Sequence, residues 1–371
     1  MSMKWAAHEG EGGTDRATIG VVALLLLGGL LMLYSASAPF SLLHYGSGHQ
    51  MLARQAIAAA VGIAVAFALT RIDYRLLRHL SEVLLLGAFV LVVVTVLPVG
   101  SLADGRWLHL GPFDVQPTEL LKFALIIYIA CTIERKGDAL RGFVPGVLPF
   151  VVVLGVIALV VLQQPDLGML LVLGAITAVM LFLGGARVSH LGALFAAGIP
   201  CALLAVLLAP YRLARLIAFL SPAEFSTSSG YQALQSLVAV GSGGIVGRGL
   251  GASRAKLLYL PQAHSDFVFS VTAEELGLMG SVLLLGLFAA LAWRSVCIAR
   301  AASDPFGRLL ALGIGFALLM QAAINVAVAV GLLPVTGLTL PFFSHGGSSL
   351  VVTLAMIGVL LSVSRHAGRR S

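Results

Sequence analysis

Residues 229–236 read SGYQALQS, residues 241–251 read GSGGIVGRGLG, and residues 260–266 read LPQAHSD. All three stretches lie in the one long segment of this chain that is too polar to cross a membrane. The segment extends approximately over 210–266, and apolar runs of transmembrane length make up most of the rest. Because polar groups are costly in hydrocarbon, their concentration in one loop marks where a polar substrate can be handled. We expect a short amphipathic helix, a flexible basic glycine-rich loop and, at Asp266, a carboxylate at a helix start.

The composition is typical of an integral membrane protein. Of the 371 residues, 59% are hydrophobic and only 11% are charged, which is outside the range of soluble globular proteins. The net charge of +7 would suggest nucleic-acid binding in a soluble protein, but in a membrane protein basic residues set the topology. We therefore predict an all-α integral membrane protein with one domain over 1–371, surrounded by membrane lipids and without a nucleic-acid partner.

Apolar runs predict about ten transmembrane helices, because a helix needs roughly 20 residues to cross the hydrocarbon. One run is short and carries two charged residues, Glu119 and Lys122. The expected segments are 17–37, 52–70, 79–98, 118–133, 143–163, 167–185, 190–209, 267–293, 307–331 and 347–364.

The basic residues predict the orientation. If the N-terminus is cytoplasmic, fifteen of the 23 Lys and Arg residues fall on the cytoplasmic side and eight on the outer side. We therefore expect both termini in the cytoplasm and the 210–266 segment, between helices 7 and 8, on the extracytoplasmic face. Five of the eight outer residues lie in that segment, where a pyrophosphate or an anionic headgroup is a natural partner, and headgroup anchoring alone is the alternative. They are Arg212, Arg215, Arg248, Arg254 and Lys256.

Five motifs in order along the chain strongly resemble the SEDS family (shape, elongation, division and sporulation). They occupy 106–119 (RWLHLGPFDVQPTE), 164–168 (QPDLG), 230–251, 260–277 and 331–349. The last motif is more similar to the cell-division branch of the family than to the elongation branch.

The resemblance implies a peptidoglycan glycosyltransferase of the bacterial cytoplasmic (inner) membrane, with its active site on the outer face. Such an enzyme polymerises lipid II by inverting β-1,4 glycosyl transfer, with polyprenyl pyrophosphate as the leaving group. The partners that the resemblance implies are a class B penicillin-binding protein transpeptidase and other proteins of the division or elongation complex.

Asp266 is the residue that the resemblance marks as catalytic, whereas from the residues alone it could be only a helix cap or a solvated carboxylate. Pyrophosphate is already a good leaving group, so the remaining task is to remove the proton of the acceptor hydroxyl, which one general base can do. The departing charge could be stabilised by basic side chains or by a divalent cation, Mg²⁺ or Mn²⁺, held by Asp266 and the pyrophosphate. Glu274 and Glu275 lie too far along the next helix to share a proton with Asp266, and we expect them to line a lower part of the cavity.

Other polar residues are expected to bind the substrate or to shape its cavity. Glu119 and Lys122 are three residues apart, so they can pair on one helix face, either as a packing contact or as part of the cavity. Arg106 could bind a phosphate, and Asp166 either caps a helix or lines the cavity. The family usually has tyrosine in place of His345, which is therefore left out. The expected substrate-binding set also includes Arg248, Lys256, Ser344, Gly346, Gly347 and Ser348.

Two functions of other classes would also use such a chain. A lipid flippase would need a polar cavity with charges such as Glu119 and Lys122, but it would not need a carboxylate in the loop. A non-catalytic scaffold of the division machinery would tolerate the loss of Asp266. The outward basic segment and its aspartate favour the enzyme.

Overall fold

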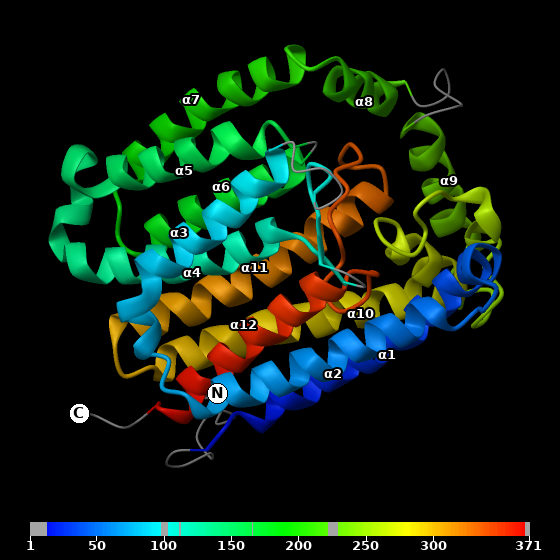
Figure 1. The fold of residues 1–371 in the computed structure, drawn as a ribbon, viewed down its shortest axis with the longest axis horizontal. Coiled ribbons are helices and arrows are strands. Elements are labelled where there is room, and N and C mark those ends of the chain that lie inside the picture. Colours follow the sequence, from blue (N-terminus) through cyan, green and yellow to red (C-terminus); the bar gives the residue numbers. More distant parts are fainter. Residues whose placement is uncertain (1–12, 98–102, 111–112, 165, 222–228, 368–371) are drawn as a thin grey trace, which may run out of the picture.

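The computed structural model describes residues 13–97, 103–110, 113–164, 166–221 and 229–367, which are mainly helical (Figure 1). Residues 222–228 of the predicted outer segment lie outside these ranges. The long helices are α1 (Arg16–Tyr45), α2 (Gln50–Arg71), α3 (Leu76–Val96), α4 (Pro117–Lys136), α5 (Leu148–Val161), α6 (Leu167–Leu183), α7 (Val188–Leu207), α10 (Val268–Ala301), α11 (Pro305–Ala329) and α12 (Gly347–Arg365). Two short antiparallel strands, β1 (Leu108–Leu110) and β2 (Phe113–Val115), form a hairpin that the sequence did not predict.

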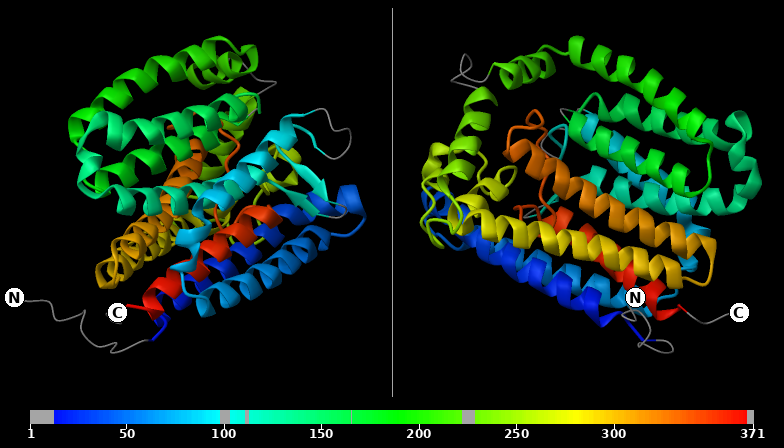
Figure 2. Two further views of the ribbon diagram at one scale, coloured as in Figure 1. Left: turned by 60° about the vertical axis from the view of Figure 1, so that its left-hand side comes forward. Right: turned by 180° about the vertical axis from the view of Figure 1, so that it is seen from behind.

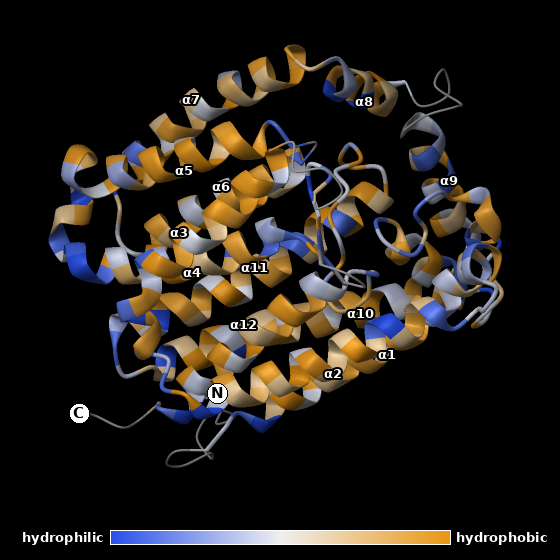
Figure 3. Ribbon diagram, viewed as in Figure 1, coloured by the Kyte–Doolittle hydropathy of each residue, from blue (hydrophilic) through white to orange (hydrophobic). Residues whose placement is uncertain are grey.

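Each of the ten predicted transmembrane segments forms a helix, so the all-α membrane fold is confirmed. Among the described residues, eight helical segments are long and apolar enough to cross a membrane, and α6 is apolar but has only 17 residues. The tenth, α4, carries Glu119 and Lys122. Hydrophobic residues cover the helices, whereas hydrophilic ones gather at helix ends and in the connections (Figure 3).

The centre of the bundle is formed by α4, α11 and α12, where most side chains are buried. Helix α12 packs along α2, and α10 packs along α11. A glycine allows the first of these pairs to approach closely, because a Cβ on Gly358 would lie 2.6 Å from the carbonyl oxygen of Ala66. Small residues of this kind are the usual contact between membrane helices. Helix α7 lies at the edge of the bundle, and most of its side chains are exposed (Figure 1).

The two ends of the described chain lie together at one end of the bundle (Figure 2). Asp15 caps α1 by accepting hydrogen bonds from the backbone N–H groups of Ala17 and Thr18, and it pairs with Arg294 of α10 (Nη2–Oδ1 2.8 Å). Its own backbone N–H donates to Oγ of Ser364 in α12 (3.2 Å). Both ends therefore lie on one side, as an even number of spans requires.

The described part of the predicted outer segment, between α7 and α10, folds as a defined structure. It contains two helices, α8 (Pro210–Leu220) and α9 (Ser229–Ser242), and a short π-helical turn, Ala255–Tyr259. Helix α8 was not predicted, although Pro210 at its first turn is a usual helix start.

The glycine-rich stretch after α9 is not the flexible loop that the sequence analysis expected. It packs against a break in α10 at Gly277, which has a φ of +67°. The backbone N–H groups of Arg248 and Gly249 donate to the carbonyl oxygens of Glu274 and Glu275, each at 3.0 Å. The carbonyl groups that the break releases from the helix thus find new partners, which fixes the stretch in place.

Candidate functional site

Asp266 does not cap a helix. Helix α10 begins after Phe267, and no side chain caps it, so the capping alternative is wrong for Asp266. The carboxylate lies instead against Gly337, in the loop between α11 and α12. A Cβ on Gly337 would be 3.6 Å from Oδ2 of Asp266 and 3.3 Å from Nη1 of Arg106. A carboxylate and a guanidinium from distant parts of the sequence therefore meet at one glycine.

The carboxyl group of Asp266 holds its proton more tightly than a solvated aspartate does. Burial raises the pKa of Asp266 to about 6, although the positive charges of Arg106 and Arg215 act to lower it. With this pKa the group is mostly ionised at neutral pH, yet it is basic enough to accept a proton in a transition state.

Asp166 holds Arg106 in position. Nη2 of Arg106 lies 2.6 Å from Oδ1 of Asp166, which is fully buried. Asp166 also caps α6 by accepting a hydrogen bond from the N–H of Met169 (3.1 Å), so the capping alternative is correct here. Its Oδ2 accepts a hydrogen bond from Nε2 of Gln116 (3.3 Å), whose backbone N–H donates to Oγ of Ser348 (3.0 Å). Nε and Nη2 of Arg106 are buried and form no hydrogen bond with a described residue, although Nη2 lies at ion-pair distance from Asp166.

The serines and glycines of the last motif support the backbone around Asp266. The hydroxyl of Ser344 donates to the carbonyl oxygen of Ser265, directly before Asp266. The N–H of Gly346 donates to Oε1 of Gln55 in α2 (3.2 Å), and Gly347 is the first residue of α12. The first contact joins the start of α10 to the loop before α12, and the second joins that loop to α2.

Glu119 and Lys122 form the predicted pair inside the bundle. Nζ of Lys122 lies 2.5 Å from Oε2 of Glu119 and 2.5 Å from Oε1 of Gln321 in α11. All three residues are buried, and Nε2 of Gln321 donates to the carbonyl oxygen of Thr339 (3.0 Å). The pair is therefore connected to the loop that carries Gly337.

Asn325 is a residue of the site that the sequence analysis missed. Its Nδ2 donates to the carbonyl oxygens of Asp266 (2.9 Å) and Leu338 (2.7 Å), which ties the two sides of the site together. A signal was present in the sequence, because Gln321 and Asn325 lie four residues apart in a helix that is otherwise apolar after Arg308, and so they share a face. Two amides on one face of an apolar helix predict a buried polar contact.

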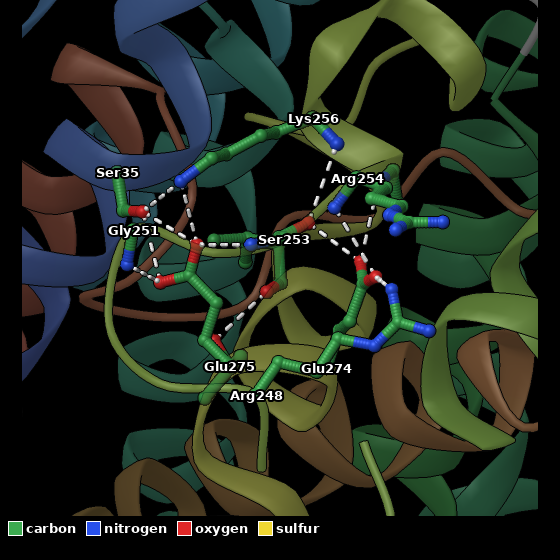
Figure 4. Close-up of polar contacts among 11 residues, drawn as sticks. Ser35, Arg248, Gly251, Ser253, Arg254, Lys256, Glu274 and Glu275 are labelled. Carbon is green, nitrogen blue, oxygen red and sulfur yellow. Dashed lines mark hydrogen bonds and ion pairs between the residues drawn. The ribbon is translucent and has the colours of Figure 1, made fainter. Parts of the chain in front are cut away.

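Glu274 and Glu275, which were expected to line a lower part of the cavity, bind Arg248 in the glycine-rich stretch and Lys256 after it (Figure 4). Arg248 pairs with Glu274 (Nη1–Oε1 3.0 Å), and Lys256 pairs with Glu275 (Nζ–Oε1 2.7 Å). Lys256 also donates to Oγ of Ser35 in α1 (2.8 Å). We call Arg248, Lys256, Glu274 and Glu275 the glutamate clasp. It joins the outer segment to α10 and α1.

His264 and His345 add no positive charge to the site at neutral pH. Burial lowers the pKa of each imidazole to about 4. The ring of His264 packs on Phe40 of α1, with 4.7 Å between ring centroids. The backbone carbonyl oxygen of His264 accepts a hydrogen bond from the backbone N–H of His345 (2.8 Å). The positive charge that reaches Asp266 therefore comes from arginines.

The side chains around Asp266 do not fit a cation held by the protein alone. Within the described part of the chain, no three His, Cys, Asp or Glu side chains gather where they could hold a metal ion. Asp166 is the other carboxylate whose charge reaches Asp266, and it is paired with Arg106. Hard divalent cations need several oxygen ligands, which the described side chains around Asp266 do not supply.

Comparison with known proteins places these features in a family. The family model described as cell cycle protein, FtsW/RodA/SpoVE, matches residues 15–369. The probable peptidoglycan glycosyltransferase FtsW of Geobacter sulfurreducens is 42% identical over 339 residues, which cover 91% of each chain.

Solved structures show the same fold. A chain from a study of the structural coordination of polymerization and crosslinking by a peptidoglycan synthase complex has a TM-score of 0.79 at 32% identity, over 96% of this chain and 99% of that one. The crystal structure of the rod shape determining protein RodA of Thermus thermophilus has a TM-score of 0.72 at 30% identity, with the same coverage of both chains.

Proposed function

The chain belongs to the FtsW/RodA/SpoVE family of cell cycle proteins, and from that premise we propose that it polymerises lipid II into the glycan strands of peptidoglycan during septal cell-wall synthesis. It is a peptidoglycan glycosyltransferase, as its FtsW relatives are named, and its identity to FtsW (42%) exceeds its identity to RodA (30%). This difference supports the division role that the sequence analysis expected.

We propose that the enzyme works in the bacterial inner membrane, with its site on the outer face and a class B penicillin-binding protein transpeptidase as its partner. The similarity to a chain of a peptidoglycan synthase complex supports such a partner. Both termini and the side of the protein with most of the Lys and Arg residues then face the cytoplasm.

The observation that carries the mechanism is the half-buried Asp266, with its raised pKa, beside Arg106. In the proposed reaction, the carboxylate of Asp266 accepts the proton of the acceptor hydroxyl as that oxygen attacks the anomeric carbon of the donor. The bond from this carbon to the pyrophosphate oxygen breaks with inversion. The pyrophosphate leaves with the electron pair, and Asp266 ends protonated.

Arg106 has two tasks in this proposal. Its positive charge keeps Asp266 ionised at neutral pH, since the pKa would otherwise rise further. Its Nη1, which lies next to Gly337, would donate to an oxygen of the reacting substrate, where negative charge develops. The ion pair with Asp166 fixes the guanidinium before the substrate arrives, which lowers the cost of reorganisation.

The test is polymerisation of purified lipid II by the full chain, reconstituted with its transpeptidase partner. We expect glycan polymer from the wild type and from Asp114→Asn, which changes an exposed outer carboxylate. We expect no polymer from Asp266→Asn at equal folding and equal complex assembly. Polymer from Asp266→Asn would remove Asp266 as the base, because asparagine cannot accept the proton.

A transport assay separates the enzyme from the other functions. If a well-folded wild-type complex moved lipid II across a bilayer without polymerising it, the flippase alternative would replace our proposal. If it did neither, and Asp266→Asn still supported assembly and division, the scaffold alternative would replace it.

A further inference from the structure

A small, mostly apolar pocket lies beside the site and is not used in the mechanism above. Its walls come from the start of α6 (Leu167), the end of α7 (Val206), α8 (Leu216 and Arg215) and the loop before α12 (Thr336). Two of these residues directly follow or precede members of the site in the chain. Leu167 follows Asp166, and Thr336 precedes Gly337, so the pocket and the site share two backbone segments.

Most basic residues of the outer segment are already bound within the protein. Arg212 is buried, and it donates to the hydroxyl of Tyr211 (2.7 Å) and to the carbonyl oxygens of Ala205 (3.0 Å) and Leu162. The glutamate clasp holds the charges of the two basic residues Arg248 and Lys256. Two arginines remain, Arg215 in the pocket wall and the exposed Arg254.

Arg215 differs from Arg254 in its position. Its guanidinium lies 5.9 Å from the ring centroid of Tyr211 and forms no hydrogen bond or ion pair with any residue that the structure describes. Its charge reaches Asp266, since it is one of the groups that lower the pKa of that carboxyl. A partly exposed cation thus stands at the junction of an apolar pocket and the site.

We propose that Arg215 binds the pyrophosphate of the donor lipid and that the pocket beside it takes the first isoprene units of the donor tail. A ligand with an anionic head and an apolar tail matches a wall with one free guanidinium and otherwise mainly apolar side chains. This inference rests on the proposed function, and it assigns the donor to the α6–α8 side of Asp266.

The chemistry of the reaction distinguishes the donor from the acceptor. The donor pyrophosphate is bonded to the carbon under attack, so it must lie near the base that deprotonates the attacking hydroxyl. The acceptor pyrophosphate is separated from its attacking hydroxyl by a disaccharide. A cation close enough to act on Asp266 is therefore placed for the donor pyrophosphate.

Equilibrium binding tests the inference without any reaction. Geranylgeranyl pyrophosphate and geranylgeraniol, which has the same tail without the charge, are titrated against the full chain in nanodiscs, with empty nanodiscs subtracted. We expect Arg215→Gln to weaken pyrophosphate binding by about tenfold or more, and Arg215→Lys to recover part of it. We expect the matched control, Arg254→Gln, to stay within about twofold of the wild type.

The alcohol tests the pocket. Geranylgeraniol should bind the wild type and Arg215→Gln equally and bind Val206→Trp more weakly, because tryptophan fills the pocket from α7. Unchanged pyrophosphate affinity in Arg215→Gln would overturn the proposal. So would an equal loss in Arg254→Gln, which would indicate general attraction by positive charge. If Arg215→Gln does not fold, a wild type that binds the alcohol as tightly as the pyrophosphate would overturn it instead.

Failure of this inference can be told from failure of the proposed function. If the wild type polymerises lipid II while Arg215→Gln keeps full pyrophosphate affinity, only the role of Arg215 is lost. If the wild type binds the pyrophosphate but forms no polymer, and Arg215→Gln binds the pyrophosphate more weakly, the glycosyltransferase proposal fails and the anion site stands.

Discussion

Arg106 and Asp266 meet at Gly337, where a single added methyl group would lie within 4 Å of both side chains. Three segments that are distant in the sequence converge there, namely the loop before the β hairpin, the start of α10 and the loop between α11 and α12. Two features explain why glycine occupies this position. A side chain would crowd Arg106, and the φ of +75° is unfavourable for other residues.

We predict that Gly337→Ala lowers the rate of polymerisation at least tenfold, because the methyl group moves the guanidinium of Arg106 by a few tenths of an ångström. The control is Gly331→Ala, which has a similar φ of +71° but faces the side chain of Leu237. Both variants carry the same backbone strain, so equal melting temperatures with unequal rates would confirm the prediction. Equal rates would contradict it.

The pH dependence of the rate should follow the ionisation of Asp266. Its pKa is raised to about 6, and only the ionised form accepts a proton. The rate at low lipid II concentration should therefore fall about tenfold per pH unit below pH 6 and level off above it. Initial rates of polymerisation between pH 4.5 and 8 measure this fall. A midpoint near pH 4 would show that the base is a solvated carboxylate and not Asp266 in this setting.

Removing one partner of the buried pair should destabilise the bundle. Lys122→Met leaves the carboxylate of Glu119 without its cation, which we expect to cost about 3–5 kcal/mol of unfolding free energy. The double variant Glu119→Gln with Lys122→Met removes both charges and should recover most of the loss. Thermal unfolding in detergent measures both. A stable double variant without activity would show that the pair also acts on the substrate.

The glutamate clasp predicts a structural role for Lys256, because its ammonium group is bound by Glu275 and Ser35. Lys256→Met and Glu275→Gln should each lower the melting temperature, and the double variant should lose less than the two losses added together. Arg254→Gln serves as the exposed control. If Lys256→Met instead raised the KM for lipid II at an unchanged melting temperature, its side chain would bind substrate, as the family resemblance implied.

The helices could be predicted from the sequence because a transmembrane helix is recognised by the length of its apolar run alone. The pairing of Glu119 with Lys122 was also accessible, since it depends on local spacing. The partners of Arg248 and Lys256 could not be predicted from local spacing. These pairs depend on the break at Gly277, which turns Glu274 and Glu275 toward a stretch some 20 residues earlier in the chain.

The placement of Asp266 and Arg106 at the same glycine could not be derived from spacing either. It requires the β hairpin, the cap of α6 by Asp166 and the hydrogen bonds of Asn325 to act together, and each of these joins segments that are far apart in sequence. The motifs predicted many residues of the candidate site, but not Asn325 or Arg215, and they did not indicate which side chains support the backbone and which are free to bind. Ser344 supports the backbone, whereas Arg215 is free.

The break at Gly277 also sets the height of the site relative to the lipid. Helix α10 has 34 residues, which would measure roughly 50 Å unbroken, against about 30 Å of hydrocarbon. Residues 278–301 are long enough to cross, so in our proposal residues 268–276 and the aspartate before them lie at the level of the lipid headgroups. At this height a sugar chain can lengthen in water while the lipid that carries it stays immersed in the bilayer.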